Sequence, residues 1–472
     1  MSAQPLFIGG TSSNAGKSWV ATAICASLRR KGIRVAPFKA QTMSNHSYPC
    51  ADGGEIGRAQ VAQAEACGLM PESAMNPILL KPNTDGTSQV IVRGRVWKTL
   101  RARGYYRETS VLRQRVLEAY HSLASRFDVV VIEGAGSVSE LNLRAHDVVN
   151  LELVKALEAP WVLVADIERG GVFASVAGTL ALCDADERRL FRGVMVNKFR
   201  GDRSLFDEGQ LLLQERCGAR CLGVWPYADG LALDAEDSLA TSTTRLGEVP
   251  AGASIAIVQL PSLSNGTDFS RLSWADWVTA AVARQYDFVI LPGTKDTMGA
   301  LAWLRVQGLD EWVRAQHRRG ATIIGICGGF QILGERVRDP DGVESSGGEA
   351  AGLGLLPVET TLAPDKVTRV RRAVTPRGAE FDAYEIHLGV TTSREPTLPF
   401  ARFDDGSVDG ARYGRVYGTY LHGALESPAV CQELFGVTLP SAPSKAATYS
   451  ALADWFESSL EQPADWLPVV GS

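Results

Sequence analysis

The chain has 472 residues, of which 45% are hydrophobic and 21% charged, with a net charge of -5 and a pI near 5.8. This length exceeds what one compact core usually contains, so two or more domains are expected. The acidic balance argues against nucleic acid or an anionic membrane surface as the main partner.

The chain start and the cysteines indicate a cytoplasmic protein. The first residues, Met-Ser-Ala-Gln-Pro, lack the basic stretch of a secretory signal and lead directly into an apolar run. No window approaches the roughly 20 apolar residues of a membrane span. The eight cysteines form no tetrad with metal spacing, so we expect them to be reduced. The sequence leaves the oligomeric state open.

Apolar, β-branched runs alternate with helical patterns along the whole chain. In the first half, strands are expected at residues 6–9, 34–38, 128–133, 161–166, 193–197 and 221–225, and helices at 18–31 and 110–126. In the second half, strands are expected at 254–260, 288–292 and 322–327. This alternation is typical of an α/β protein whose mostly parallel sheets are covered by helices on both faces.

A polar stretch with proline and glycine but no period, ATSTTRLGEVPAG, ends at residue 252 and resembles an interdomain linker. We therefore expect a first domain over residues 1–240, a linker over 241–252 and a second domain over 253–450. Residues 451–472 are expected to form a loosely attached C-terminal tail.

The segment GGTSSNAGKS, residues 9–18, follows the first strand and opens a helix, as a phosphate-binding loop does. Its spacing is one residue longer than the usual motif, and this form resembles the loop of dethiobiotin synthetase-type ATP enzymes. The alternative is a tight glycine turn without a ligand. The expected nucleotide-binding residues are Thr11, Ser12, Asn14, Ala15, Gly16, Lys17 and Ser18.

Carboxylates near this loop predict a Mg2+ site. Ser18 offers a hydroxyl, Glu133 ends a buried strand at the ligand-binding edge of the sheet, and Asp52 lies in a glycine-rich turn. For Asp52 a plain turn role is the alternative. Asn197, at another strand end, could contact an adenine edge or cap a helix. Lys39 could neutralise a phosphate or a substrate carboxylate.

A second site is expected at GATIIGICGGFQILGE, where Cys327 lies between a buried strand and a helix and is followed by two glycines. This pattern predicts a nucleophile elbow with a thiol, whereas the alternative is a buried core cysteine. His422 is the expected base, and His387 is expected to line the pocket or position substrate. The backbone N–H groups of Gly293 and Gly328 could form an oxyanion hole.

Together these motifs resemble the cobyric acid synthase family. The segments GTSSNAGKS, PFKAQTMSN, ADGGEIGRAQ, NPILLKP, VIEGAGS, ADIERGGVFAS, NKFRGD, LPGTKDT, GICGGFQILG, YEIHLG and GTYLHG follow the family's order up to about residue 430. The resemblance implies a dethiobiotin synthetase-like phosphate-loop domain acting as an ATP-dependent amidoligase and a class I glutamine amidotransferase-like domain. It also implies a corrinoid substrate, with ATP and glutamine as co-substrates. The histidine-ligand pattern for a bound cobalamin cofactor is absent, so Mg2+ is the only cofactor expected.

The resemblance implies that Cys327 and His422 release ammonia from glutamine. The other domain would activate carboxylates of adenosylcobyrinic acid a,c-diamide as acyl phosphates. The stretch from Gln41 to Ser47 departs from the family's usual Gln-Asn-Met-Ser-Leu-Asn-Ser and is expected near substrate or nucleotide. Glu426 could orient His422, but a third member of the site is left open. The alternatives are a cobyrinic acid a,c-diamide synthase, a related amidoligase, or a non-catalytic nucleotide-switch regulator.

Overall fold

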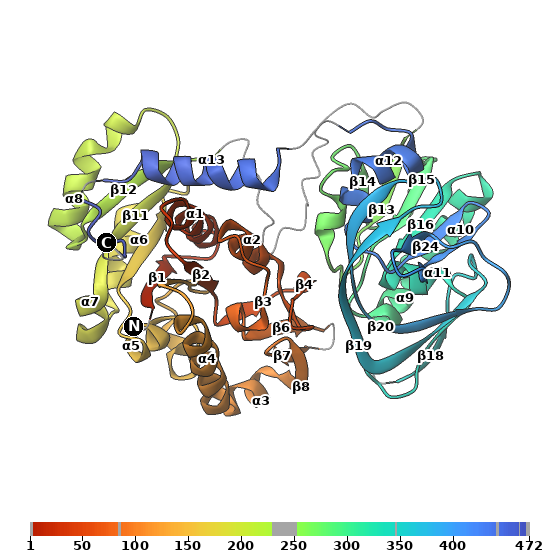
Figure 1. The fold of residues 1–472 in the computed structure, drawn as a ribbon, viewed down its shortest axis with the longest axis horizontal. Coiled ribbons are helices and arrows are strands. Elements are labelled where there is room, and N and C mark those ends of the chain that lie inside the picture. Colours follow the sequence, from red (N-terminus) through yellow and green to blue (C-terminus); the bar gives the residue numbers. More distant parts are fainter. Residues whose placement is uncertain are drawn as a thin grey trace.

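The computed structural model describes residues 3–83, 86–228, 253–344, 347–439, 443–461 and 463–468. The expected linker, 241–252, lies outside these residues. Within them no helix is long and apolar enough to cross a bilayer. The described chain forms two α/β halves that lie side by side (Figure 1).

The N-terminal half is built on a six-stranded sheet with the order β12-β11-β10-β1-β9-β2, in which all neighbours are parallel. Alternate residues of β1 point to opposite faces: Phe7 belongs to one hydrophobic core, and Leu6 and Ile8 belong to the other. Helices therefore cover both faces, as the alternation in the sequence predicts. The strands of this sheet are β1 (Gln4–Gly10), β2 (Val35–Phe38), β9 (Val129–Glu133), β10 (Trp161–Asp166), β11 (Phe191–Phe199) and β12 (Cys221–Pro226). The helices are α1 (Lys17–Arg30), α2 (Arg58–Ala66), α3 (Ala102–Arg107), α4 (Thr109–Ala124), α5 (Leu151–Ala156), α6 (Val172–Ala181), α7 (Ala185–Leu190) and α8 (Asp207–Cys217).

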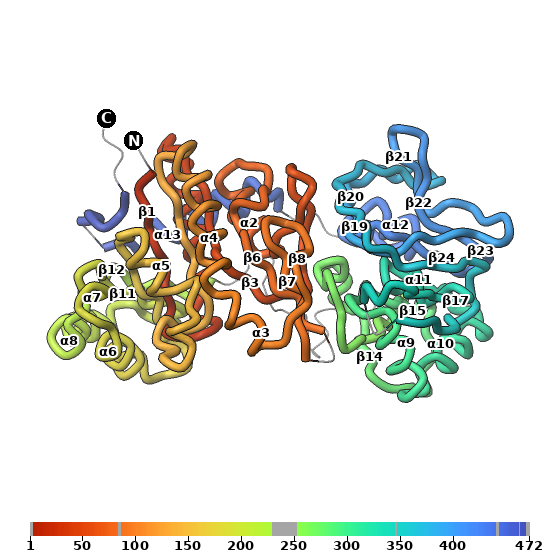
Figure 2. Tube along the Cα trace, turned by 90° about the horizontal axis from the view of Figure 1, so that it is seen from below, coloured from red at the N-terminus to blue at the C-terminus, as the bar shows by residue number. Residues whose placement is uncertain are grey.

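A smaller sheet is inserted between β2 and β9, and none of its strands was among those expected from the sequence. Its order is β3-β6-β7-β8, and a separate hairpin pairs β4 with β5. Both views place these strands between the main sheet and the C-terminal half (Figures 1 and 2). The strands are β3 (Gln41–Met43), β4 (Ser47–Pro49), β5 (Glu55–Gly57), β6 (Ile78–Pro82), β7 (Thr87–Val92) and β8 (Arg95–Arg101).

The C-terminal half has a second six-stranded sheet, with the order β14-β13-β15-β16-β24-β23. All neighbours are parallel except β23 and β24. The strands are β13 (Ile255–Val258), β14 (Asp276–Val278), β15 (Phe288–Leu291), β16 (Thr322–Ile326), β23 (Ala411–Tyr413) and β24 (Val416–Thr419). The helices are α9 (Thr297–Val306), α10 (Leu309–Arg318), α11 (Gly328–Leu333) and α12 (Pro428–Phe435). A further sheet contains β17 (Arg336–Asp339), β18 (Gly348–Ala351), β21 (Ala401–Phe403), β22 (Val408–Asp409) and the long hairpin of β19 (Val358–Val374) and β20 (Glu380–Ser393).

The end of the chain corrects the expected boundary at residue 450 and the expected loose tail. The last helix, α13 (Lys445–Ser458), returns to the N-terminal half and lies along α1 (Figure 1). Phe456 is fully buried and stacks on Trp225 with ring centroids 5.7 Å apart. Arg30 pairs with Asp454 and Glu457, each at 2.5 Å. The apolar residues of α13 cover a sheet face that would otherwise be open to water, so this segment is part of the first domain's core.

Candidate functional site

The glycine-rich loop between β1 and α1 has the backbone of a phosphate-binding turn. Gly16 caps α1 with φ of 102°, and a Cβ there would lie 2.1 Å from the Asn197 side chain. The Lys17 ammonium donates to the carbonyl oxygens of Ser12 at 2.9 Å and Gly136 at 2.7 Å. The loop thus curls around a buried lysine at a helix N-terminus, where backbone N–H groups favour anions.

Glu133 joins this loop to the end of β9. Its carboxylate accepts hydrogen bonds from Ser18 at 2.6 Å, from Lys39 at 3.0 Å and from Gln63. Burial opposes ionisation of Glu133, but the Lys39 charge and the Ser18 hydrogen bond outweigh it and hold the pKa of Glu133 below its usual range. The site therefore presents an ionised carboxylate beside a hydroxyl, and hard oxygen donors of this kind suit Mg2+.

For Asp52 the structure shows the turn role, whereas its expected metal role stays a prediction. Its carboxylate lies on the exposed turn 51–53 and accepts hydrogen bonds from the Ser73 hydroxyl at 2.6 Å and the Ser73 backbone N–H at 3.2 Å. Asp52 therefore ties two loops together, which is the turn role weighed as the alternative. Within the described residues no group of three or more histidine, cysteine, aspartate or glutamate side chains could hold a metal ion.

Two other residues that were expected to bind nucleotide or substrate form hydrogen bonds within the protein. The Asn197 amide donates to the Ala15 carbonyl at 2.9 Å, so this side chain helps to hold the backbone of the phosphate loop in place. The Gln41 side-chain oxygen accepts from the Tyr105 hydroxyl. Lys39 is 2% exposed and is held by Glu133, which places its charge beside the loop rather than in open solvent.

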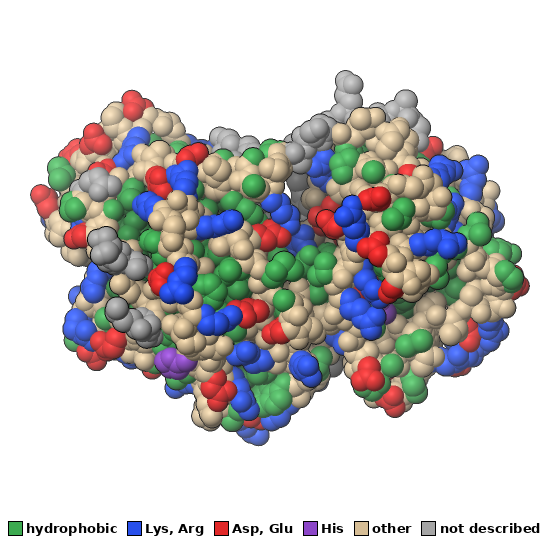
Figure 3. Space-filling view, in the orientation of Figure 1, with side chains coloured by type: hydrophobic (Ala, Val, Ile, Leu, Met, Phe, Trp, Pro, Cys, Tyr) green, Lys and Arg blue, Asp and Glu red, His purple; other side chains and the backbone are tan. Residues whose placement is uncertain are grey.

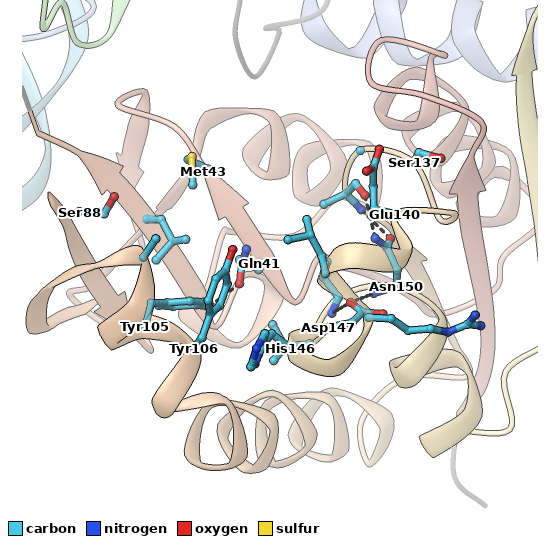
Figure 4. Close-up of a pocket in the computed structure, with 18 of the residues that line it drawn as sticks. Gln41, Met43, Ser88, Tyr105, Tyr106, Ser137, Glu140, His146, Asp147 and Asn150 are labelled. Atoms are coloured by element: carbon cyan, nitrogen blue, oxygen red, sulfur yellow. Dashed lines mark hydrogen bonds between the residues drawn. The ribbon is translucent and has the colours of Figure 1, made fainter. Parts of the chain in front are cut away.

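A cavity of about 380 Å³ opens next to this loop (Figure 4). Gly136, whose carbonyl accepts from Lys17, lines it together with Gln41, Met43, Tyr105 and neighbouring apolar residues. In the close-up, Tyr106 and His146 lie next to each other, and their rings stack with centroids 4.4 Å apart. A largely apolar cavity beside a phosphate loop is suited to hold an organic acceptor next to a nucleotide.

In the C-terminal half, Cys327 forms the expected elbow between β16 and α11. Its φ of 51° and ψ of -110° are unusual for a residue with a side chain and indicate a strained turn. The two glycines after it permit close packing, since a Cβ at Gly328 would lie 2.5 Å from Thr294 and one at Gly329 would lie 2.0 Å from the Leu291 carbonyl oxygen. The buried-core alternative for Cys327 does not explain this geometry.

His422 is fully buried and is oriented by a residue that the sequence analysis missed. Asp268 lies with its Oδ2 2.7 Å from Nδ1 of His422, and its Oδ1 accepts from the Gly423 backbone N–H at 2.7 Å. Burial lowers the pKa of His422, but the Asp268 carboxylate and the Cys327 thiol outweigh it and raise that pKa to about 10. The His422 Nε2 has no hydrogen-bond partner among the described residues, which leaves it available to a reacting group.

The three side chains form a Cys–His–Asp arrangement in which the thiol proton can be held by the imidazole. Glu426, the candidate orienter, instead lies 3.6 Å from Arg58 of the N-terminal half. The signal for Asp268 was present in the segment SNGTDF, which follows β13 at the same sheet edge as Cys327. Sequence distance alone gave no reason to prefer that carboxylate over Glu426.

The pocket in front of Cys327 is lined from both halves of the chain. Asn45, Ser47 and Lys81 come from the inserted strands and loops of the N-terminal half. His387 lines the same pocket, as expected, and stacks on Tyr420 with ring centroids 3.8 Å apart. Gly293 lies against His422, since a Cβ there would be 2.9 Å from the imidazole.

The stretch from Gln41 to Ser47 therefore reaches two sites. Gln41 and Met43 line the large cavity beside the phosphate loop, whereas Asn45 and Ser47 line the pocket at Cys327. The expectation that this stretch lies near substrate or nucleotide stays a prediction for both parts.

Comparisons with known proteins agree with this division into two sites. A model described as the CobQ/CobB/MinD/ParA nucleotide binding domain matches residues 6–240, and one described as the CobB/CobQ-like glutamine amidotransferase domain matches residues 254–430. Cobyric acid synthase from Jannaschia sp. (strain CCS1) is 44% identical over 475 residues, which cover 98% of this chain and 97% of that protein.

Solved structures show more distant likenesses. A glutamine amidotransferase matches with a TM-score of 0.30 and 17% identity over 39% of this chain and 99% of its own. The signal recognition particle receptor FtsY from Elizabethkingia anophelis, in complex with GDP, matches with a TM-score of 0.29 and 16% identity over 48% of this chain and 57% of its own. The assignment depends instead on the sequence relative, which is similar along almost its whole length. The chain therefore belongs to the cobyric acid synthase family, the ATP- and glutamine-dependent amidating enzymes of cobalamin biosynthesis.

Proposed function

We propose that the protein amidates peripheral carboxylates of adenosylcobyrinic acid a,c-diamide to give adenosylcobyric acid. The observation that carries this proposal is the pairing of two complete sites in one chain. One site has a phosphate loop beside a cavity, and the other has a thiol elbow with a buried imidazole and carboxylate. The relative's name supports a corrinoid acceptor.

In the glutaminase half, His422 takes the thiol proton, and the Cys327 sulfur attacks the side-chain amide carbon of glutamine. Ammonia leaves, a glutamyl thioester forms, and water then releases glutamate and restores the thiol. The backbone N–H groups of Gly293 and Gly328 would stabilise the oxyanion, a role supported by the position of Gly293 against His422 and of Gly328 directly after Cys327. Asp268 holds the imidazole in position throughout.

In the synthetase half, a carboxylate oxygen of the acceptor attacks the γ-phosphorus of ATP, giving an acyl phosphate and ADP. Ammonia then attacks the acyl carbon, and inorganic phosphate leaves as the amide forms. Lys17 and the loop from Thr11 to Ser18 would hold the phosphates. Activation is needed because an ionised carboxylate has no good leaving group.

Mg2+ would be held by Ser18 and Glu133 together with phosphate oxygens, and when bound it would neutralise charge on the polyphosphate. Asp52, whose carboxylate accepts a hydrogen bond from Ser73, would stay outside this set. Lys39 lies beside Glu133 and can face either a phosphate or the substrate carboxylate.

The proposal is tested by two variants assayed with two nitrogen sources. Cys327→Ser should abolish glutamine-dependent amidation and leave amidation with concentrated ammonium salt intact. Lys17→Ala should remove amidation with either source while glutamine hydrolysis persists. Mass spectrometry of each candidate corrinoid, including cobyrinic acid and its a,c-diamide, would follow each conversion of acid to amide. Equal loss of both activities in Cys327→Ser would contradict the division between the two sites.

A further inference from the structure

The pocket at Cys327 contains more charge than the thiol chemistry requires. Three lysines line it, Lys81 from the N-terminal half and Lys295 and Lys366 from the C-terminal half, together with Glu344. Two of these lysines share one buried carboxylate, since Glu55 accepts from Lys81 at 2.5 Å and also from Lys366. Their charges are therefore already balanced in part by the protein.

Lys295 is different. Its side chain makes no hydrogen bond or ion pair to any of the residues that the structure describes. Burial lowers the pKa of Lys295, and this effect is larger than the opposite effect of the Glu344 charge. The carboxylates of Glu344, Glu55 and Asp296 act on Lys295 through their charge but form no ion pair with it, so an anionic ligand in the pocket would stabilise its ammonium group. Lys295 directly follows Thr294, which packs against Gly328 beside the nucleophile.

Asn45 supplies the complementary feature. Its side-chain oxygen is buried in the same pocket and accepts no hydrogen bond from the described residues. Glu344 adds a carboxylate to the pocket and accepts from the Thr297 backbone N–H at 2.9 Å. The Asn45 oxygen and the Glu344 carboxylate together favour a ligand that has a positively charged hydrogen-bond donor.

The ligand that satisfies this pocket carries a carboxylate, an ammonium group and an amide that reaches Cys327. We propose that Lys295 binds the α-carboxylate of glutamine and that Asn45, from the N-terminal half, accepts a hydrogen bond from its α-ammonium group. This inference depends on the proposed glutaminase reaction and adds the residues that select the amide donor.

A consequence is that the donor site is complete only when the two halves are docked. Asn45 is held at the boundary by its neighbours: the Ser47 backbone N–H donates to Asn265 at 3.0 Å, and the Gly266 N–H donates to His46 at 3.2 Å. Asn265 and Gly266 precede Asp268, so the contacts that place Asn45 also adjoin the segment that orients His422.

The test uses two analogues that each lack one group of glutamine. Glutaminamide has no α-carboxylate, and glutaramate has no α-ammonium group. For each analogue, the Ki is measured for competitive inhibition of glutamate release from glutamine. The KM for glutamine is measured in the same assay. Lys295→Met should raise the KM for glutamine and the Ki for glutaramate at least about thirtyfold, while the Ki for glutaminamide changes by less than about threefold. Lys295→Arg should restore most of the binding.

Asn45→Ala should show the opposite selectivity. The KM for glutamine and the Ki for glutaminamide should rise about tenfold, and the Ki for glutaramate should stay nearly constant. Lys98→Met, at an exposed lysine paired with Glu108, serves as the matched control and should change none of these constants. Amidation with ammonium salt verifies that each variant is folded.

Equal weakening of all three ligands in Lys295→Met or Asn45→Ala would show that the residue only shapes the pocket and would overturn the inference. A wild-type protein that releases no glutamate from glutamine would instead overturn the proposed function, and the inference with it. The first result leaves the two-site reaction standing, so the two failures are distinguishable.

Discussion

Replacing Asp268 by asparagine should disable the glutaminase half and spare the synthetase half. The substitution keeps the size of the side chain but removes the charge 2.7 Å from Nδ1 of His422. The pKa of His422 stands at about 10 instead of 6.5. Since one pKa unit corresponds to about 1.4 kcal/mol, the buried imidazolium is favoured by roughly 5 kcal/mol, of which the Cys327 thiol supplies a part.

Loss of the part of this stabilisation that comes from Asp268 should lower kcat/KM for glutamine hydrolysis by about a hundredfold to ten-thousandfold. The assay measures glutamate release and, separately, amidation driven by ammonium salt, which should stay within about twofold of wild type. Glu426→Gln is the matched control, because that carboxylate lies 3.6 Å from Arg58, whereas the Asp268 carboxylate lies 2.7 Å from the imidazole. Glutamate release by Asp268→Asn within about threefold of wild type would refute the role assigned to Asp268.

The same variant gives a dependence of stability on pH. A histidine whose pKa is raised on folding stabilises the protein fully below its unfolded-state value of 6.5, and this contribution is lost as the pH rises through about 10. The difference in unfolding free energy between wild type and Asp268→Asn should therefore shrink from pH 6.5 to pH 10. A difference that grows with pH would show that the raised pKa is not the source of the stabilisation.

Three further substitutions test other parts of the structure. Phe456→Ala should lower the unfolding free energy by about 3–5 kcal/mol, measured by denaturant titration, because its ring is fully buried against Trp225; a change below about 1 kcal/mol would show that α13 is loosely attached. Gly328→Ala should reduce glutamine hydrolysis at least about tenfold while ammonium-driven amidation persists, since its Cβ would lie 2.5 Å from Thr294. In Asp52→Ala the Mg2+ concentration needed for half-maximal amidation should stay within about twofold of the wild-type value. An increase of about a hundredfold would show that Asp52 binds the metal.

Local patterns predicted both reactive turns. At each, a short apolar strand leads through a glycine-containing turn into a helix, and the residue with the proposed role, Lys17 or Cys327, lies at the start of that helix. The required backbone conformation is encoded within about ten residues, because glycine alone tolerates the close approaches found at Gly16 and Gly328. The alternation of strands and helices likewise predicted the two parallel sheets.

The inserted strands β3 to β8 were not anticipated, since short strands with mixed polarity carry weak periodic signals. Their placement gives the stretch from Gln41 to Ser47 its two environments, because a few extended residues span the distance between neighbouring pockets.

The amino-acid sequence by itself predicted the family, which the comparisons confirm, and it proposed Lys17 for phosphate binding, Cys327 as the nucleophile and His422 as its base. Only the tertiary structure decided which carboxylate orients His422, because Asp268 is 154 positions away in the chain and reaches the imidazole through the packing of the sheet edge. The same holds for the contact of Asp52 with Ser73 and for α13, which returns to the first sheet to cover its apolar face. A reactive group within one turn can be predicted from the local sequence, whereas contacts between side chains far apart in the sequence depend on how the whole chain is packed.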